Sequence, residues 1–344
     1  MRRKRLLYHT TILFLLFLIS IIAGTVLIYV RLHRQTEQVF SPEIAPERMK
    51  RHVVIYSSLQ ESQLEALKLA FEAQHPDVLL DYYCAGTGKI LTKVSAERQQ
   101  GAIQADLLWV GDPDSYTTYL DADLLISYSS QYEDDIPEQF RFADSRLTAA
   151  RLIVMGFAYN TREMKGKRPP ATWNDLLSTD RVVFADPASS GTMLYTLRAL
   201  TRDSRYGWDY WKALKASGAE VCGGSGATGY QVGVGVYQVG IVADHVAAMV
   251  RNMGLPVAFV YPEDCLVIPS PIALFKDSPN PEEGRLLFDF ILSDAGQAVL
   301  ASVDIVPVRG GFSLPPHTSV DMDEAAGSPV RQELLDRFDA LFLR

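Results

Sequence analysis

The sequence predicts an α/β fold in which parallel strands alternate with helices and a ligand crevice lies at the strand ends. Two observations support this prediction. Short apolar runs rich in β-branched and aromatic residues alternate with amphipathic helical patterns from residue 53 onward. Four of these runs end in turns of small and hydroxyl-bearing residues that open the next helix. Ligands of open α/β sheets bind at such strand ends, so four of them can converge on one crevice.

The clearest turn follows the apolar run 182–184 and precedes a predicted helix at 193–201. A helix that begins there offers unpaired backbone N–H groups, side-chain hydroxyls and the positive end of its dipole, which together favour an anion. An ordinary capped helix is the alternative interpretation, because capping residues are common. The candidate ligand-binding residues in this turn are Ser189, Ser190, Gly191 and Thr192.

The same pattern occurs three more times. The strand-like runs 53–56, 82–84 and 221–222 each lead into a polar or glycine-rich turn and then a helical pattern. The candidate ligand-binding residues of these turns are Ser57, Ser58, Thr87, Gly88, Ser225 and Thr228.

The remaining elements are predicted from hydrophobic periodicity and from the turn and capping residues between the apolar runs. In the first half we expect strands at 53–56, 78–83, 105–110 and 152–159, and helices at 61–74, 89–99, 116–125 and 173–177. In the second half we expect strands at 182–184, 220–222, 239–242 and 257–260, and helices at 193–201, 206–217, 246–253, 281–292, 295–301 and 330–343. The run 266–275 reads as a long strand broken by two prolines, which excludes it from the middle of a regular ladder and suits a crossing between lobes.

Composition excludes several classes of function. The chain has 344 residues, of which 48% are hydrophobic, enough for a packed core and about two domains. A net charge of −8 without a basic stripe beyond the N-terminus argues against nucleic-acid binding. Metal-ligand spacing is lacking, as are a G-x-S-x-G elbow and a readable triad, so we expect no metal site and no enzyme.

The N-terminus predicts a membrane segment. Four basic residues, 2–5, precede a mostly apolar run whose part 12–30 has 19 residues, about enough to span a bilayer. No A-x-A-like exit is visible, so we expect an uncleaved single-pass anchor at 1–34 rather than a signal peptide, followed by a polar tether at 35–50. The basic cluster before the span places the bulk of the chain outside the cytoplasm, in the periplasm or beyond the cell. If the segment is cleaved, the protein is secreted to the periplasm instead.

Motifs over most of the chain carry a family resemblance. They are 54–58 (VIYSS), 86–89 (GTGK), 106–109 (DLLW), 186–191 (DPASSG), 261–264 (YPED), 268–271 (IPSP), 280–282 (NPE) and 290–297 (FILSDAGQ). From about residue 53 to 308 the chain resembles the type-II bilobed solute-binding proteins of bacterial ABC importers, in the branch of ferric-iron, phosphonate and hexose-phosphate binders.

The resemblance implies two lobes of mixed sheet flanked by helices, with a ligand cleft between them that closes by hinge motion. Lobe one would be 51–150 and 270–312, lobe two 151–269, and 313–344 a tail with a terminal helix. It also implies no catalysis, no cofactor and a monomer. The expected partners are a small solute and the permease and ATPase of an importer, or alternatively a sensor histidine kinase.

The ligand is predicted from a position at which this chain differs from the ferric binders of the family. Ferric binders of the family use a tyrosine pair after the strand that corresponds to 239–242, where this chain has Asp244 and His245. Hydroxyl-rich turns suit a phosphate or phosphonate group better than a trivalent cation, so iron is the alternative ligand. Asp244 and His245 could hold the far end of the solute, although a helix cap and a core histidine are the other interpretations. Asp112 is a further candidate or a turn residue before Pro113, and Lys89 could add charge or stay solvated.

The three cysteines leave two alternatives open. Cys84 and Cys222 each precede a predicted binding turn, and Cys265 lies at a predicted crossing. Outside the cytoplasm a pair could oxidise, with 222 and 265 the suggested partners, and three free thiols are equally compatible with the sequence.

Overall fold

A computed structural model describes residues 25–26, 50–142, 144–310 and 330–343. The chain forms two compact units, Met1–Met49 and Lys50–Arg344, and the sheet, its helices and the cavity all belong to the second. The predicted anchor and tether lie almost entirely outside the described residues. Among the residues that are described, the structure contains no helix with both the length and the apolar character to cross a membrane.

Ten strands of the described chain form one continuous sheet. They are β1 (Arg51–Ser57), β2 (Val78–Cys84), β3 (Leu107–Trp109), β4 (Thr148–Asn160), β5 (Val182–Ala185), β6 (Glu220–Cys222), β7 (Val239–Ala243), β8 (Val257–Val260), β9 (Leu266–Leu274) and β10 (Val306–Pro307). Their order is β2-β1-β3-β9-β4-β7-β5-β6, with β8 and β10 also paired to β4. The pairs β2-β1, β1-β3, β7-β5 and β5-β6 are parallel, as the alternation of strands and helices predicts.

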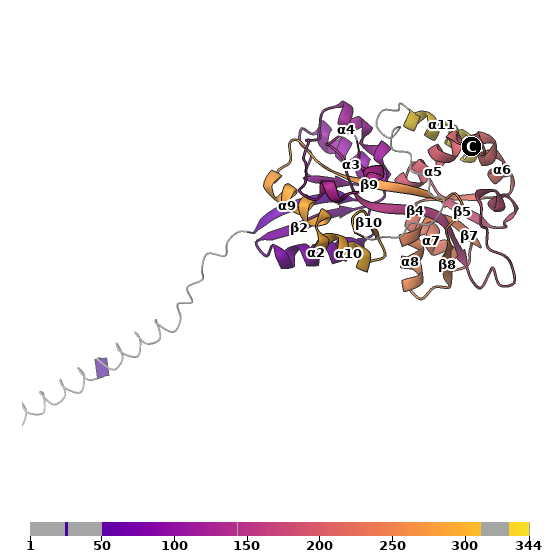
Figure 1. Ribbon diagram of the computed structural model, residues 1–344, viewed down its shortest axis with the longest axis horizontal. Helices are drawn as coiled ribbons and strands as arrows, with labels where there is room; N and C mark the ends of the chain where they lie inside the picture. The colour runs from indigo at the N-terminus through magenta and orange to yellow at the C-terminus, as the bar shows by residue number, and fades with distance from the viewer. Residues whose placement is uncertain (1–24, 27–49, 143, 311–329, 344) are drawn as a thin grey trace, which may run out of the picture. The chain divides into compact units, whose positions relative to one another are not determined.

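Helices cover both ends of this sheet (Figure 1). They are α2 (Glu61–Gln74), α3 (Thr87–Gln99), α4 (Thr117–Asp121), α5 (Gly191–Arg202), α6 (Gly207–Ala216), α7 (Ser225–Gly233), α8 (Asp244–Asn252), α9 (Pro281–Leu292), α10 (Asp294–Ser302) and α11 (Val330–Phe342). Apolar residues at helical spacing explain how the helices pack. On α2, for example, Leu64, Leu67 and Phe71 share one face and are fully buried. The helix expected at 116–125 is shorter, because a 3-10 turn (Pro113–Tyr116) precedes α4.

Strands β4 and β9 join the two halves of the sheet, as Figure 1 shows. They pair antiparallel with each other, β9 continues along β3, and the far half of β4 pairs with β7 and β8. The prediction that prolines break this segment was wrong: β9 is continuous and lies mid-sheet. Pro269 and Pro271 are tolerated because β3 reaches β9 only at Ile272, so the prolines have a strand neighbour on one side alone.

The buried side chains form separate cores at the two ends. One packs α2, α9 and α10 against the first strands around Phe71 and Trp109, and a smaller one lies under α3 and α4. The other packs α5, α6 and α8 around Phe184 and Trp211. The terminal helix α11 belongs to this last core through the fully buried Phe338. The centres of the Phe338 and Phe184 rings are 6.1 Å apart. All three cysteines are free.

Candidate functional site

A cavity of about 460 Å³ lies where strand ends and helix starts from the two halves face each other. It combines the ends of β1 and β2 with the turns that follow β5, β6 and β7, so the strand-end prediction located it. The predicted residues that line it are Ser58, Thr87, Ser189, Ser190, Gly191, Thr192, Ser225 and His245.

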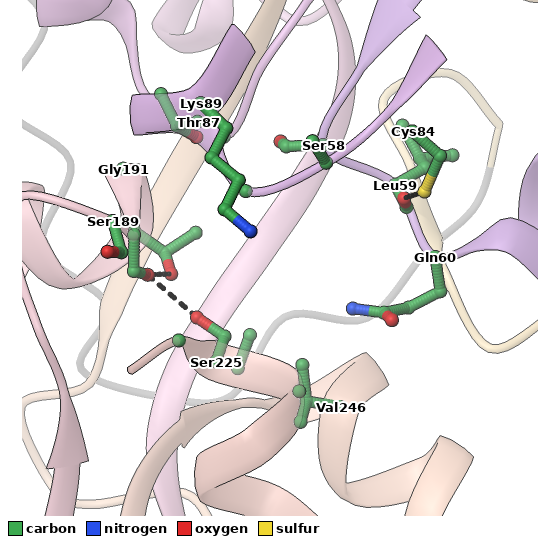
Figure 2. Close-up of a pocket in the computed structure, with 18 of the residues that line it drawn as sticks. Ser58, Leu59, Gln60, Cys84, Thr87, Lys89, Ser189, Gly191, Ser225 and Val246 are labelled. Carbon is green, nitrogen blue, oxygen red and sulfur yellow. Dashed lines mark hydrogen bonds between the residues drawn. The ribbon is translucent and has the colours of Figure 1, made fainter. Parts of the chain in front are cut away.

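Hydroxyl groups from the starts of α5 and α7 lie close together in the cavity wall (Figure 2). Ser190 caps this helix, its Oγ accepting from the backbone N–H of Met193 at 3.3 Å. The same Oγ lies 2.7 Å from Ser225 Oγ and 3.1 Å from Thr192 Oγ1. The first turns of α5 and α7 therefore bring three hydroxyls and a helix N-terminus to one place, which is a favourable environment for an anion.

Five predicted residues do not line the cavity. Ser57 Oγ accepts from the backbone of Leu59 at 3.2 Å, and Thr228 Oγ1 donates to Gly224 O at 2.9 Å. Gly88 is placed against the backbone of the opposite half, as described below. The other two are the carboxylates Asp112 and Asp244, which accept hydrogen bonds from nearby groups of the protein.

Both carboxylates have local roles instead. Asp112 is fully buried and accepts from Ser115 N at 3.0 Å and Ser115 Oγ at 2.8 Å, which makes it the cap of the turn that follows β3. Burial raises the pKa of this carboxyl. Asp244 is the first residue of α8, and its Oδ1 accepts from His245 N at 2.8 Å and from Val154 N at 3.4 Å. The turn interpretation of Asp112 is therefore confirmed, whereas the cap interpretation of Asp244 is wrong, because Ala243 is the N-cap of α8 and Asp244 is its first helical residue.

Arg151 was missed by the sequence analysis. It lies on β4 where the two halves join, is 1% exposed, and lines the cavity. Its Nε makes a long contact of 3.4 Å to Ser270 Oγ, its guanidinium lies 5.6 Å from the ring centre of Trp109, and Nη1 has no hydrogen-bond partner among the described residues. Burial lowers its pKa to about 10, an effect that Asp244 partly opposes, so it stays charged at neutral pH.

The sequence contained one weak indication that Arg151 is a site residue. Arg151 is the one charged residue within the thirteen residues of β4. A charge within a buried apolar strand requires a partner, and functional sites are a frequent reason for one.

Two further polar side chains project into the cavity from the first half of the sheet. Figure 2 shows Lys89 of α3 extending from its helix toward Ser225, and Gln60 pointing in beside Leu59. The Gln60 amide faces Gly226, where a Cβ would lie 3.6 Å from its oxygen. Lys89 therefore supplies the second cationic group of the wall.

His245 closes the cavity on the side of α8. It is 6% exposed, and its Nδ1 lies 3.5 Å from Asp244 Oδ1. Burial lowers its pKa, so the ring is neutral at pH 7. Within the described ranges, no group of three or more His, Cys, Asp or Glu side chains is arranged to hold a metal ion.

Glycines allow the two halves to touch beside the cavity. Gly88 N lies 3.5 Å from Ser189 O, and a Cβ on Gly88 would lie 2.2 Å from the carbonyl oxygen of Ala188. A Cβ on Gly86 would meet Ser189 O at 2.8 Å. Because real Cβ atoms do not approach that closely, this backbone contact requires glycine on the α3 side. The structure therefore has its halves in contact around the cavity.

An α/β body of two halves joined by crossing strands, with a polar cavity between them, has the architecture of a periplasmic solute-binding protein. Comparisons with known proteins agree. Residues 103–335 match the family model described as bacterial extracellular solute-binding protein. The chain belongs to this family. It is a binding protein of the type that serves ABC importers, located outside the cytoplasm, and it is not an enzyme.

Individual relatives are distant. The putative 2-aminoethylphosphonate-binding periplasmic protein of Salmonella typhimurium is 24% identical over 290 residues, covering 79% of this chain and 83% of that protein. The structure is similar to periplasmic binding protein AfuA from Actinobacillus pleuropneumoniae, solved with fructose 6-phosphate, with TM-score 0.75, 24% identity, and coverage of 86% and 99%. Iron-bound HitA from Pseudomonas aeruginosa gives TM-score 0.67, 18% identity, and coverage of 85% and 98%. These likenesses confirm the predicted bilobed fold.

Proposed function

We propose that this protein captures a small solute bearing a phosphate or phosphonate group and presents it to an importer. The observation that carries the proposal is Arg151: a charged guanidinium, almost fully buried, that lines the cavity with one nitrogen unpartnered among the described residues. Burial of a charge costs several kcal/mol, a cost that Asp244 offsets only in part, and a bound anion would offset more of it.

The rest of the wall has matching chemistry. Lys89 adds a second positive charge, and the start of α5 adds the positive end of a helix dipole. The hydroxyl of Thr87 and one hydroxyl of the bonded pair Ser190 and Ser225 can each donate a hydrogen bond to a phosphoryl oxygen. A phosphoryl group has three oxygens able to accept several such bonds, which suits a site made of many donors.

Ferric iron is the competing ligand predicted from the sequence. A trivalent cation prefers anionic oxygen ligands and is repelled by nearby positive charge. The cavity is lined by the cations Arg151 and Lys89 and by no Asp or Glu among the described residues. Asp112 lies behind Gly191, but it is fully buried and both of its oxygens accept hydrogen bonds from Ser115. This arrangement favours the anion.

A thermal-shift screen of the full-length protein in mild detergent tests the proposal. The compounds are inorganic phosphate, fructose 6-phosphate, glycerol 3-phosphate, 2-aminoethylphosphonate and ferric citrate. A ligand that binds the folded state raises the melting temperature, so a shift with one or more phosphoryl compounds supports the proposal. A shift with ferric citrate alone refutes it.

Alanine variants then test the residues. Ser225→Ala and Thr87→Ala each remove one donor from the bound anion, and each is expected to weaken binding by about 1–3 kcal/mol. Unchanged affinity in both would move the anion site away from this wall.

We also propose that residues 1–34 remain attached and hold the protein at the membrane. The basic cluster 2–5 and the apolar run 12–30 support the proposal. Mass spectrometry of the protein recovered from the membrane fraction after carbonate washing should find peptides from residues 31–50 joined to the preceding apolar segment. A mature N-terminus beyond residue 24 would show cleavage instead. The alternative role as a sensor for a histidine kinase stays a prediction from sequence.

A further inference from the structure

The cavity has a charge pattern that restricts the solute beyond its phosphoryl group. Among the described residues that line it, Arg151 and Lys89 are cationic, His245 is neutral, and none is Asp or Glu. Asp112 lies behind Gly191, where an added Cβ would meet its Oδ2 at 1.9 Å, but it is fully buried and its oxygens accept from Ser115. Asp244 Oδ1 accepts from backbone N–H groups, and Glu61, next to Gln60, is exposed.

The part of the wall away from the start of α5 is uncharged. Gln60 and Tyr83 offer an amide and a hydroxyl, while Leu59, Ala227 and Val246 offer apolar surface. An amide or hydroxyl both donates and accepts, so such a wall can pair with hydroxyl groups of a ligand in either direction. It offers an ammonium group no anionic partner.

The cavity also has room for more than a phosphoryl group. Its volume of about 460 Å³ lies within the usual range for small organic ligands. Gly223 and Gly224 line it, and a Cβ at either would meet no atom within 4 Å. Gly224 has an extended backbone, with φ of −174°, that any residue adopts, so the fold does not require glycine there. The absence of a side chain leaves space for a ligand.

We infer that the solute is a phosphorylated or phosphonylated compound whose remaining part is uncharged and hydroxyl-bearing, and that the site rejects zwitterions that carry an ammonium group. This inference rests on the proposed phosphoryl-binding function and narrows it. An ammonium in this cavity loses its hydration, finds no carboxylate, and is repelled by Arg151 and Lys89. A hydroxyl at the same position has none of these costs.

Two isosteric pairs of ligands test the inference by isothermal titration calorimetry on the full-length protein at pH 7.5. The pairs are 2-hydroxyethylphosphonate with 2-aminoethylphosphonate, and glucose 6-phosphate with glucosamine 6-phosphate. Within each pair a hydroxyl is exchanged for an ammonium and the phosphoryl group is kept. We expect the hydroxyl member of any pair that binds to bind at least about tenfold more tightly.

The outcomes separate the inference from the proposal beneath it. Equal or tighter binding of the amino member overturns the inference and leaves phosphoryl binding intact, because both ligands carry that group. No binding of any of the four compounds overturns the inference, and the proposal falls with it if no phosphoryl compound of the thermal-shift screen binds either.

A gain-of-function variant gives an independent reading. Gln60→Glu places a carboxylate in the neutral wall without changing side-chain length, and we expect it to shift the amino-to-hydroxyl affinity ratio by at least about tenfold toward the amino compound. Gln100→Glu is the matched control, because it makes the same change of charge at an exposed position outside the cavity wall, and it should leave that ratio unchanged. An unchanged ratio in Gln60→Glu, with a melting temperature like that of the parent, contradicts the placement of the ligand.

Discussion

Replacement of Arg151 by methionine should weaken ligand binding without destabilising the ligand-free protein. The side chain is 1% exposed, its Nη1 has no partner in the described part of the chain, and its Nε contact is long. Methionine keeps much of the apolar stem and removes the charge. Because replacement of buried charge by apolar groups is often neutral or stabilising, the ligand-free protein should unfold at an unchanged free energy or one higher by about 1–4 kcal/mol.

The loss in affinity should be large. Truncation of one partner of a buried, hydrogen-bonded charge pair costs about 2–5 kcal/mol, which corresponds to a rise in Kd of roughly 30- to 4,000-fold. Arg151→Lys keeps the charge but not the planar fork, so its Kd should lie between those of the parent and of Arg151→Met.

The assay combines urea unfolding of the ligand-free protein with calorimetry of the tightest phosphoryl ligand from the screen. Arg205→Met is the matched control. Arg205 lies outside the cavity wall, is exposed, and pairs with Asp203, its Nη2 lying 2.6 Å from Oδ2. Its removal should leave Kd unchanged. A destabilised Arg151→Met protein with unchanged Kd would refute the reasoning, since Arg151 would then be a structural residue whose charge the ligand does not meet.

Three further predictions follow from the same geometry. Gly88→Ala places a Cβ 2.2 Å from Ala188 O, so it should weaken ligand binding while the ligand-free melting temperature stays near the parent value. Gly101→Ala is the control: no atom lies within 4 Å of its Cβ, so it measures only the backbone strain of a non-glycine residue at a φ of +107°. Gly224→Val fills the open space in the wall and should abolish binding of glucose 6-phosphate more than that of 2-hydroxyethylphosphonate, as calorimetry of both would show. His245 has a lowered pKa, so the unfolded state binds its proton first: the free energy of unfolding should fall as pH drops below about 6.5, and His245→Gln should flatten that slope by up to about 1.4 kcal/mol per pH unit.

Each of these three has a result that would count against it. Tight ligand binding by Gly88→Ala would mean that the contact between the halves is unnecessary for capture. Equal losses of both ligands in Gly224→Val would indicate a general distortion of the turn. Urea unfolding between pH 5 and 8 tests the third, because an unchanged slope in His245→Gln would mean that other groups set it. Among them are His75, whose pKa burial also lowers, and Asp114, whose pKa burial raises to about 7 and whose contribution to the slope has the opposite sign.

The elements of this protein are largely readable from its sequence because their signals are local. Helical spacing and flanking turn residues predicted α2 and α9 with the bounds that the structure has, and the β-branched run of β8 was located equally well. The turns that follow β1, β2, β5 and β6 were recognised as candidate ligand contacts for the same reason: a strand end followed by small hydroxyl residues is a local pattern.

The tertiary structure alone decided which side chains line the cavity. Asp112 and Asp244 have the sequence context of site residues, yet their oxygens accept hydrogen bonds from nearby backbone groups, and that choice depends on how the chain turns. Arg151 had little local signal, because its unusual state arises from burial by strands distant in sequence. Pro269 and Pro271 fit mid-sheet only because β3 ends where it does. Periodicity determines the elements, whereas the charge balance of a cavity depends on long-range packing that no short segment encodes.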